Sequence, residues 1–188
     1  MNFLALDQAT TTGWAVTDDT GNILGSGIWH LADKKRTGES RGMRYIRFEA
    51  ELKRAIETWH PDVIIHEQTL LRGGAATEIA NGLKALILKA SCVYGLEVSC
   101  VHACELKHWA TGSGKAKKSD MIKAADRYLV SAGLPPPEDD NQADAVLIGL
   151  WASSKYGTFP TPEWPSAKKK PRKRKTPGVV QEDFGLGI

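Results

Sequence analysis

The sequence predicts an α/β fold of three layers, in which a mixed five-stranded sheet carries helices on both faces. Three short apolar segments separated by turn residues open the chain, a pattern typical of an antiparallel meander. Two further apolar strands then alternate with long stretches of helical spacing, which is typical of parallel strands joined by crossover helices. The 188 residues, 41% of them hydrophobic, suffice for one domain with a substantial core.

The five strands are recognised by their apolar composition and by the turn residues around them. The turn DDTGN separates the second strand from the third, and the first and fourth strands each end in an acid, Asp7 and Glu67. The expected strands are residues 2–7, 13–17, 22–31, 62–67 and 96–102.

The helices are recognised by apolar residues that recur every three to four positions. Pro61 marks the end of the first helix, and Ser119 and Gly133 are the expected N-cap and stop of the fourth. The first helix should bury Met43, Ile46, Leu52 and Ile56 and present Arg41, Arg44 and Arg47 on a solvated face. The expected helices are residues 39–59, 75–94, 103–109, 117–133 and a last one that begins within DDNQADAVLIGLWA.

The C-terminal part of the chain differs in charge from the rest. Residues 155–188 hold eight Lys and Arg against three Asp and Glu, whereas residues 1–154 hold seventeen against nineteen. This shift predicts a domain over 1–156, followed over 157–188 by a proline-containing linker and a basic disordered tail. The tail either keeps the protein soluble or grips nucleic-acid phosphates, and a nuclear import signal is a further alternative.

The composition points away from membranes and from secretion. No apolar run reaches the roughly 18 residues of a membrane span, and the N-terminus lacks the basic region of a signal peptide. The three cysteines are odd in number and form no CxxC pair, so we expect reduced thiols and a cytoplasmic location. A zinc site that combines them with His102 or His108 is disfavoured.

Three carboxylates are expected to converge. Asp144 lies about one turn inside the last helix, too deep to cap it, while Asp7 and Glu67 end strands that should be parallel neighbours. Taken singly, each acid also fits a turn, a loop or a solvated helix face. Together they repel one another unless a cation neutralises them, and carboxylate oxygens without Cys or His suit Mg²⁺ or Mn²⁺. The convergence therefore predicts a metal site.

Four segments, in order, carry a resemblance to a known family: LALDQATTTGWAV, DVIIHEQTLL, TGSGKAKKSDM and DDNQADAVLIGLWA. They resemble the successive motifs of RuvC-type Holliday-junction resolvases, and the resemblance covers residues 1 to about 154. It implies a ribonuclease H-like fold and a metal-dependent endodeoxyribonuclease. Such an enzyme cuts four-way DNA junctions by paired symmetric nicks that leave 5′-phosphate and 3′-hydroxyl ends. The divergence between the motifs suggests a phage-encoded or mobile-element version.

The resemblance implies a ligand set with one departure from the family pattern. Asp7, Glu67 and Asp144 match the metal-binding acids, but the Asp or His that the family has three residues before the last acid is Asn141 here. Asn141 can ligate through its carbonyl oxygen but carries no charge. Asp140 shares a helix face with Asp144 and is favoured as a catalytic ligand, with Asn141 kept as the alternative. Two Mg²⁺ or Mn²⁺ ions would activate a water and stabilise the leaving oxygen.

The contacts to DNA are expected along a basic rim. The loop TGSGKAKKSDM offers backbone N–H groups and lysines to phosphates, although a solvated turn is the alternative. The resemblance implies DNA contacts for two lysines, Lys107 and Lys118, and places Leu70 where the family can carry an aromatic wedge. The expected DNA-binding residues are Leu70, Arg72, Lys107, Lys115, Lys117 and Lys118.

The expected partners are branched DNA and a second copy of the chain. The helix over 75–94 is apolar on more than one side, which fits packing on the sheet, and the family uses the matching helix to form a homodimer. The alternatives are a related nuclease for flaps or other branched DNA, and a non-catalytic junction-binding module. DQATTTGWAV also resembles the phosphate loop of actin-like ATPases and sugar kinases, but 188 residues cannot hold their second domain, so no nucleotide cofactor is expected.

Overall fold

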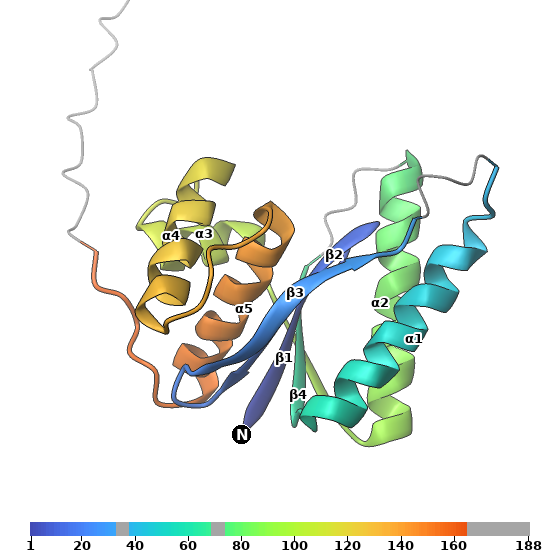
Figure 1. Ribbon diagram of the computed structural model, residues 1–188, viewed down its shortest axis with the longest axis horizontal. Coiled ribbons are helices and arrows are strands. Elements are labelled where there is room, and N and C mark those ends of the chain that lie inside the picture. The colour runs from blue at the N-terminus through green and yellow to red at the C-terminus, as the bar shows by residue number, and fades with distance from the viewer. Residues whose placement is uncertain (33–37, 69–73, 165–188) are drawn as a thin grey trace, which may run out of the picture.

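The computed structural model describes residues 1–32, 38–68 and 74–164 and contains one five-stranded sheet between two layers of helices (Figure 1). The expected three-layer α/β fold is confirmed. The strands are β1 Asn2–Asp7, β2 Thr11–Asp18, β3 Ile23–His30, β4 Val63–Glu67 and β5 Glu97–Val101. The helices are α1 Gly42–Trp59, α2 Gly74–Tyr94, α3 Ala103–Thr111, α4 Lys118–Ser131 and α5 Asp140–Tyr156.

The sheet has the strand order β3-β2-β1-β4-β5. β1, β2 and β3 form the expected antiparallel meander, whereas β4 and β5 are added in parallel beside β1. Asp7 pairs with Gly13 across β1 and β2, and Leu6 pairs with His66 across β1 and β4. The C-terminal ends of β1 and β4 therefore meet at one edge of the sheet, opposite the N-terminus in Figure 1.

Two separate cores lie on the two faces of the sheet, because side chains alternate along each strand. Ala5 and Ile65 face the layer of α3, α4 and α5, and Leu4, Leu6 and Ile64 face the layer of α1 and α2. α5 packs mainly on β1 and β2, and most of its residues from Gln142 to Ser153 are buried. A helix buried on several sides holds its N-terminal turn firmly against the edge where β1 ends.

The first helix differs from the expectation. Its buried residues are Phe48, Leu52, Ala55 and Ile56. Ile46, which was expected to be buried, is 60% exposed. Arg47 is not on a solvated face: its guanidinium donates to the carbonyl of Leu31 at 2.7 Å and pairs with the carboxylate of Glu39. Counting apolar residues did not reveal this contact because it joins the helix to the chain that follows β3.

The fourth helix also begins differently. Its N-cap is Lys117, whereas Ser119, the expected cap, lies inside the first turn. The Asp120 carboxylate accepts a hydrogen bond from the Lys117 N–H at 3.0 Å, so the acid of the first turn satisfies a backbone group at the helix start. Gly133, the expected stop, follows the helix end with φ of +72° and donates its N–H to the Val130 carbonyl.

The described part of the segment after α5, which ends at Trp164, packs on the domain. The Phe159 ring lies 6.5 Å from that of Trp109 and 6.0 Å from that of Tyr128, measured between ring centroids. Trp164 is half-buried and donates its indole N–H to the carbonyl of Trp109 at 2.9 Å. The basic tail lies outside the described residues, so the domain boundary at 156 and the tail's disorder remain predictions.

Two further expectations concern membranes and thiols. None of the helices in the described part of the chain is both long and apolar enough to cross a membrane. Cys92, Cys100 and Cys104 are exposed and free. Free thiols agree with the reduced state that the odd cysteine count predicts.

Candidate active site

Asp7 and Glu67 lie side by side at one edge of the sheet. Leu6 and His66 are register partners in the parallel pair of β1 and β4, so the acid that follows each occupies the next position. Each acid shares a strand face with the residue two positions before it, Ala5 or Ile65, both buried under the α3–α5 layer. Both carboxylates therefore belong to the face that α5 covers.

Gly13 allows α5 to reach these acids. It is the partner of Asp7 in β2, and an added Cβ there would lie 1.8 Å from the carbonyl oxygen of Asn141. Only a residue without a side chain leaves room for the first turn of α5 over the end of β1. This close approach brings Asp140 and Asp144 toward Asp7.

The electrostatics show that the carboxylates interact. Burial raises the pKa of Asp7 well above its usual range, and the charges of Asp144, Glu67, Asp140 and Asp139 raise it further, in that order. Burial, then the charges of Glu67 and Asp140, raise the pKa of Asp144 to about 7. Burial also raises the pKa of Glu67. Asp7, Glu67 and Asp144, the acids predicted from the sequence, thus form one cluster in which the negative charges repel one another.

The cluster suits a cation by its donor chemistry. Oδ1 of Asp144 is buried and has no hydrogen-bond partner among the described residues. An orphaned carboxylate oxygen and mutual repulsion are both relieved by a hard divalent cation such as Mg²⁺ or Mn²⁺. Among the described residues, no group of three His, Cys, Asp or Glu side chains is placed so that it could hold one ion. The cluster therefore supplies suitable donors without the geometry of a metal site.

The two candidates for the fourth ligand differ in their surroundings. The carboxylate of Asp140 accepts a hydrogen bond from the ammonium of Lys118, and its charge raises the pKa of both Asp7 and Asp144. The amide of Asn141 instead donates to the carboxylate of Asp139 at 2.7 Å. Asp140 is thus electrostatically part of the cluster, which favours it as a ligand, and its role remains a prediction.

Two of the predicted lysines lie at the rim of the cluster. The charge of Lys107, on α3, lowers the pKa of Glu67 and partly offsets the rise at Asp144. Lys118, at the start of α4, pairs with Asp140, and this contact raises the lysine pKa. Lys115 and Lys117 are exposed in the loop between α3 and α4. The positions predicted for Leu70 and Arg72 lie outside the described residues.

Gln8 and His66 form a contact between the strand ends that the sequence did not reveal. The Gln8 amide donates to the carbonyl oxygen of Glu67 at 2.6 Å, and Nδ1 of His66 lies 2.9 Å from the same oxygen. Gln8 follows Asp7 directly, so its hydrogen bond to the Glu67 carbonyl ties together the two strand ends that carry the acids. His66 is buried on the α1–α2 face, as expected for a residue at the back of the sheet.

Comparison with known sequences gives a consistent set of relatives, although no protein-family model matches the chain. The crossover junction endodeoxyribonuclease RuvC of Synechococcus sp. (strain WH7803) is 23% identical over 154 residues, which cover 80% of this chain and 96% of the relative. The enzyme of the same name from Corynebacterium diphtheriae is 32% identical over 106 residues, which cover 53% of this chain and 63% of the relative.

Solved structures show the same fold. The Thermus thermophilus RuvC structure superposes with a TM-score of 0.67 at 21% identity, over 82% of this chain and 95% of that one. The T. thermophilus RuvC in complex with a Holliday junction substrate gives a TM-score of 0.67 at 20% identity, over 79% of this chain and 90% of that one. The strand order and the two helical layers are thus those of the ribonuclease H-like resolvases.

Proposed function

We propose that this chain, a member of the RuvC family of crossover junction endodeoxyribonucleases, hydrolyses phosphodiester bonds at four-way DNA junctions by paired symmetric nicks. The proposed reaction depends on divalent metal ions. The observation that carries this proposal is the cluster of Asp7, Glu67 and Asp144 at one sheet edge, with its unpartnered buried oxygen. A purely structural role gives no reason to bury three carboxylates together.

The residues at this edge of the sheet have different proposed roles. Asp7, Glu67 and Asp144 hold Mg²⁺ or Mn²⁺, with Asp140 as the favoured fourth ligand. When bound, two such ions supply an activated water and stabilisation of the charge on the leaving oxygen. Lys107 and Lys118 hold the phosphates beside the cut by charge. Gln8 keeps the two strand ends at a fixed separation, as its hydrogen bond to the Glu67 carbonyl supports.

Paired nicks require two active sites, and we infer a homodimer. Large apolar side chains exposed on α2 support this inference: Leu88 is 46%, Val93 68% and Tyr94 38% exposed. A two-fold symmetric pair built on α2 matches the two-fold symmetry of a four-way junction. The solved T. thermophilus RuvC with its junction substrate supports branched DNA as the ligand class.

The test is cleavage of a synthetic four-way junction beside a linear duplex of matched sequence, in Mg²⁺ and in Mn²⁺. We expect symmetric cuts in the junction alone. Asp7→Asn should slow cleavage by about 100-fold or more, since losing a metal ligand costs several kcal/mol of transition-state stabilisation, and junction binding should persist. Glu57→Gln removes an exposed acid of α1 and should cleave normally.

The same assay separates the alternatives. Junction binding without cutting in either metal would mean a non-catalytic module, and faster cutting of flaps would mean a related branched-DNA nuclease. Normal cleavage by Asp7→Asn would remove it from the ligand set. Asp140→Asn should reduce cleavage more than Asn141→Ala, and the reverse order would assign the fourth ligand to Asn141.

A further inference from the structure

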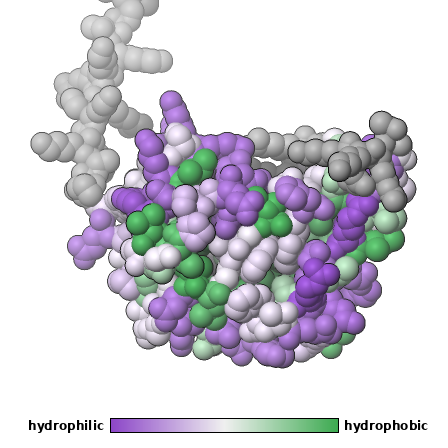
Figure 2. Space-filling model, viewed as in Figure 1, coloured by the Kyte–Doolittle hydropathy of each residue, from purple (hydrophilic) through white to green (hydrophobic). Residues whose placement is uncertain are grey.

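Gln142 is a buried polar side chain in the first turn of α5, where its exposed fraction is 7%. Figure 2 shows hydrophilic side chains gathered over the upper part of the α3–α4 layer, at the end of the molecule where α5 begins. A buried amide beneath such a surface has to find its hydrogen-bond partners within the fold. Oε1 of Gln142 accepts from the Glu138 N–H at 2.7 Å, and Nε2 donates to Oγ of Ser26 at 2.9 Å.

Part of this arrangement is a helix cap. The carboxylate of Asp139, the N-cap, accepts a hydrogen bond from the Gln142 N–H at 2.9 Å, while the Gln142 side chain reaches back to Glu138. An acid at the N-cap with Gln or Glu three positions later is typical of a helix start. A glutamate at position 142 could accept the Glu138 N–H equally well. It would, however, add a negative charge beside the acidic cluster and has no N–H to offer Ser26.

The bond to Ser26 goes beyond the cap, because it joins the helix to a strand 116 positions earlier in the chain. Ser26 lies on β3, at one edge of the sheet, and β2 separates it from β1. The contact of the Asn141 carbonyl with Gly13 sets how closely the first turn of α5 approaches the end of β1 and β2. The bond from Gln142 to Ser26 adds a sideways link from the same turn to β3.

Gln142 lies on the side of α5 away from the acids. Successive residues of an α-helix turn by about 100° around its axis, so Asp140 and Asp144 are about 40° apart and Gln142 is about 200° from Asp140. The Gln142 side chain can therefore act on the two carboxylates only through the helix that carries all three residues. A carboxylate about 5 Å from the axis moves by about 2 Å when the helix rotates by about 20°. Metal–ligand distances, by contrast, have to hold to about 0.2 Å.

We propose that Gln142 is a positioning residue: its hydrogen bond to Ser26 of β3 sets the rotation of the first turn of α5, and with it the places of Asp140 and Asp144. This inference rests on the proposed function, because it takes the two acids as ligands of a divalent ion. Gln142 itself contacts neither the ion nor DNA. Its loss should therefore weaken metal binding and cleavage while junction binding persists, since the basic rim is built by α3 and α4.

The test compares Gln142→Met and Ser26→Ala with the wild type. Met is close to Gln in size but can neither accept from Glu138 nor donate to Ser26. In each variant we expect the Kd for Mn²⁺, titrated without DNA, to rise about 10-fold, as when a group that orients metal ligands is lost. The kcat for junction cleavage should fall, and junction affinity without divalent metal should not change. Ser26→Ala should have no further effect on Kd in the Gln142→Met background, because the bond is already gone.

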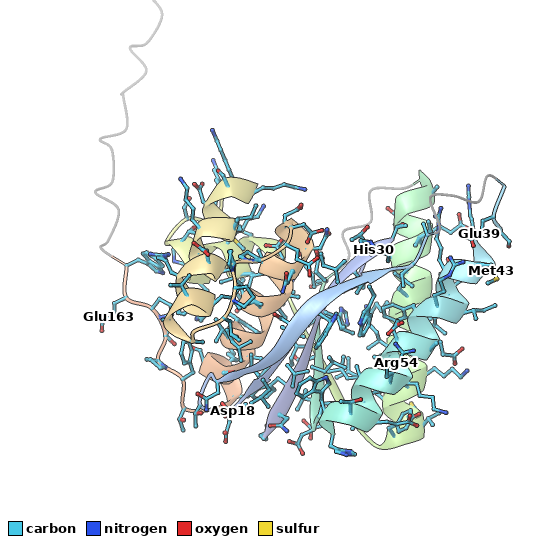
Figure 3. The ribbon with its side chains drawn as sticks, in the orientation of Figure 1. Asp18, His30, Glu39, Met43, Arg54 and Glu163 are labelled. Atoms are coloured by element: carbon cyan, nitrogen blue, oxygen red, sulfur yellow. The ribbon has the colours of Figure 1, made fainter. Side chains whose placement is uncertain are left out.

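The matched control is Ser153→Ala, at the other end of the same helix. Its buried hydroxyl donates to the Asp18 carbonyl at 2.6 Å, so this variant also loses a buried hydrogen bond between α5 and the sheet. Asp18, labelled in Figure 3, is the register partner of Asn2, at the opposite end of β1 from Asp7. Ser153→Ala should therefore keep the wild-type Kd for Mn²⁺. An unchanged Kd in Ser26→Ala, or an equal rise in Ser153→Ala, overturns the proposal.

Amide hydrogen exchange tests the same link without metal or DNA. The N–H groups of Gln142 and Ala143 are bonded to Asp139, and both should lose protection in Ser26→Ala and keep it in Ser153→Ala. Retained protection in Ser26→Ala would contradict the role of the bond, even if Gln142→Met does not fold. A wild type that binds Mn²⁺ but never cuts junctions, with the variants changed as expected, disproves the nuclease function and leaves the positioning role. Normal cutting by the wild type, with Kd and exchange unchanged in the variants, disproves the positioning role alone.

Discussion

The carboxyl group of Asp144 is buried in surroundings that disfavour its charged form. Burial is the largest cause of its raised pKa of about 7, and Glu67 and Asp140 add to it. In the unfolded chain the same group titrates near 3.9. Between these values the folded protein holds a proton that the unfolded chain has released. The contribution of Asp144 to the stability of the metal-free protein therefore falls as the pH rises from about 4 to about 7.

This direction of the pH dependence predicts how a substitution at Asp144 changes the stability of the protein. The metal-free Asp144→Asn variant should gain stability relative to the wild type as pH rises through that window, since Asn cannot ionise. The comparison with wild type matters because His66, whose pKa burial lowers, changes stability in the opposite direction and is common to both proteins. Urea unfolding at a series of pH values measures the difference.

Mg²⁺ should in turn stabilise the wild type more at about pH 8 than at about pH 5, because the ion binds ionised carboxylates. If the difference in unfolding free energy between the wild type and Asp144→Asn did not vary with pH, this result would contradict the raised pKa of Asp144.

At the scale of elements, the position of α5 depends on glycine in two places. Gly13 of β2 leaves room for the Asn141 carbonyl, and Gly149 of α5 lies over Thr17, where an added Cβ would be 2.8 Å from Cγ2. The helix can therefore approach the sheet more closely than ordinary side chains permit. The first of these contacts sets the height of Asp140 and Asp144 above Asp7.

Gly13→Ala should consequently affect both stability and the candidate site. Its Cβ cannot remain 1.8 Å from a backbone oxygen, so the first turn of α5 must shift, at a cost of about 1–3 kcal/mol in the free energy of unfolding. We expect junction cleavage to fall more than junction binding, because the acids move apart while the basic rim stays. Gly42→Ala is the control, since its Cβ meets only Ser40 Oγ at 3.5 Å. Cleavage by Gly13→Ala equal to that by Gly42→Ala would show that this close approach does not position the acids.

The periodicity of the sequence predicted the strands and helices and their order. It did not predict hydrogen bonds between residues that are far apart in the chain. The order of strands and helices, and the meeting of Asp7 with Glu67, follow from alternation and from parallel pairing. The hydrogen bond of Gln8 to the Glu67 carbonyl joins residues 59 positions apart, and that of Trp164 to Trp109 spans 55. Side-chain bonds to a remote backbone leave no periodic pattern, so these residues became visible only in the folded chain.

At the scale of the whole molecule, the paired cuts that we propose depend on how two copies of the chain would meet. The outer side of α2 is the strongest candidate because, next to α1, it borders a groove of about 170 Å³ lined by Leu86, Val93 and Tyr94. A symmetric interface would bury this apolar surface against its own copy. Each active site would then face one of two equivalent strands of the junction.

Val93→Glu should disrupt that pairing, since it places a charge where a 68% exposed apolar side chain would become buried. Sedimentation should show a monomer, and junction cutting should change from paired nicks to single, unpaired nicks with the acidic cluster intact. Leu24→Glu introduces the same charge at a 41% exposed position on β3, away from α2, and should keep both the dimer and the paired cuts. Should Val93→Glu remain a dimer that cuts in pairs, the interface lies on another surface, because a buried unpaired carboxylate on α2 could not be tolerated there.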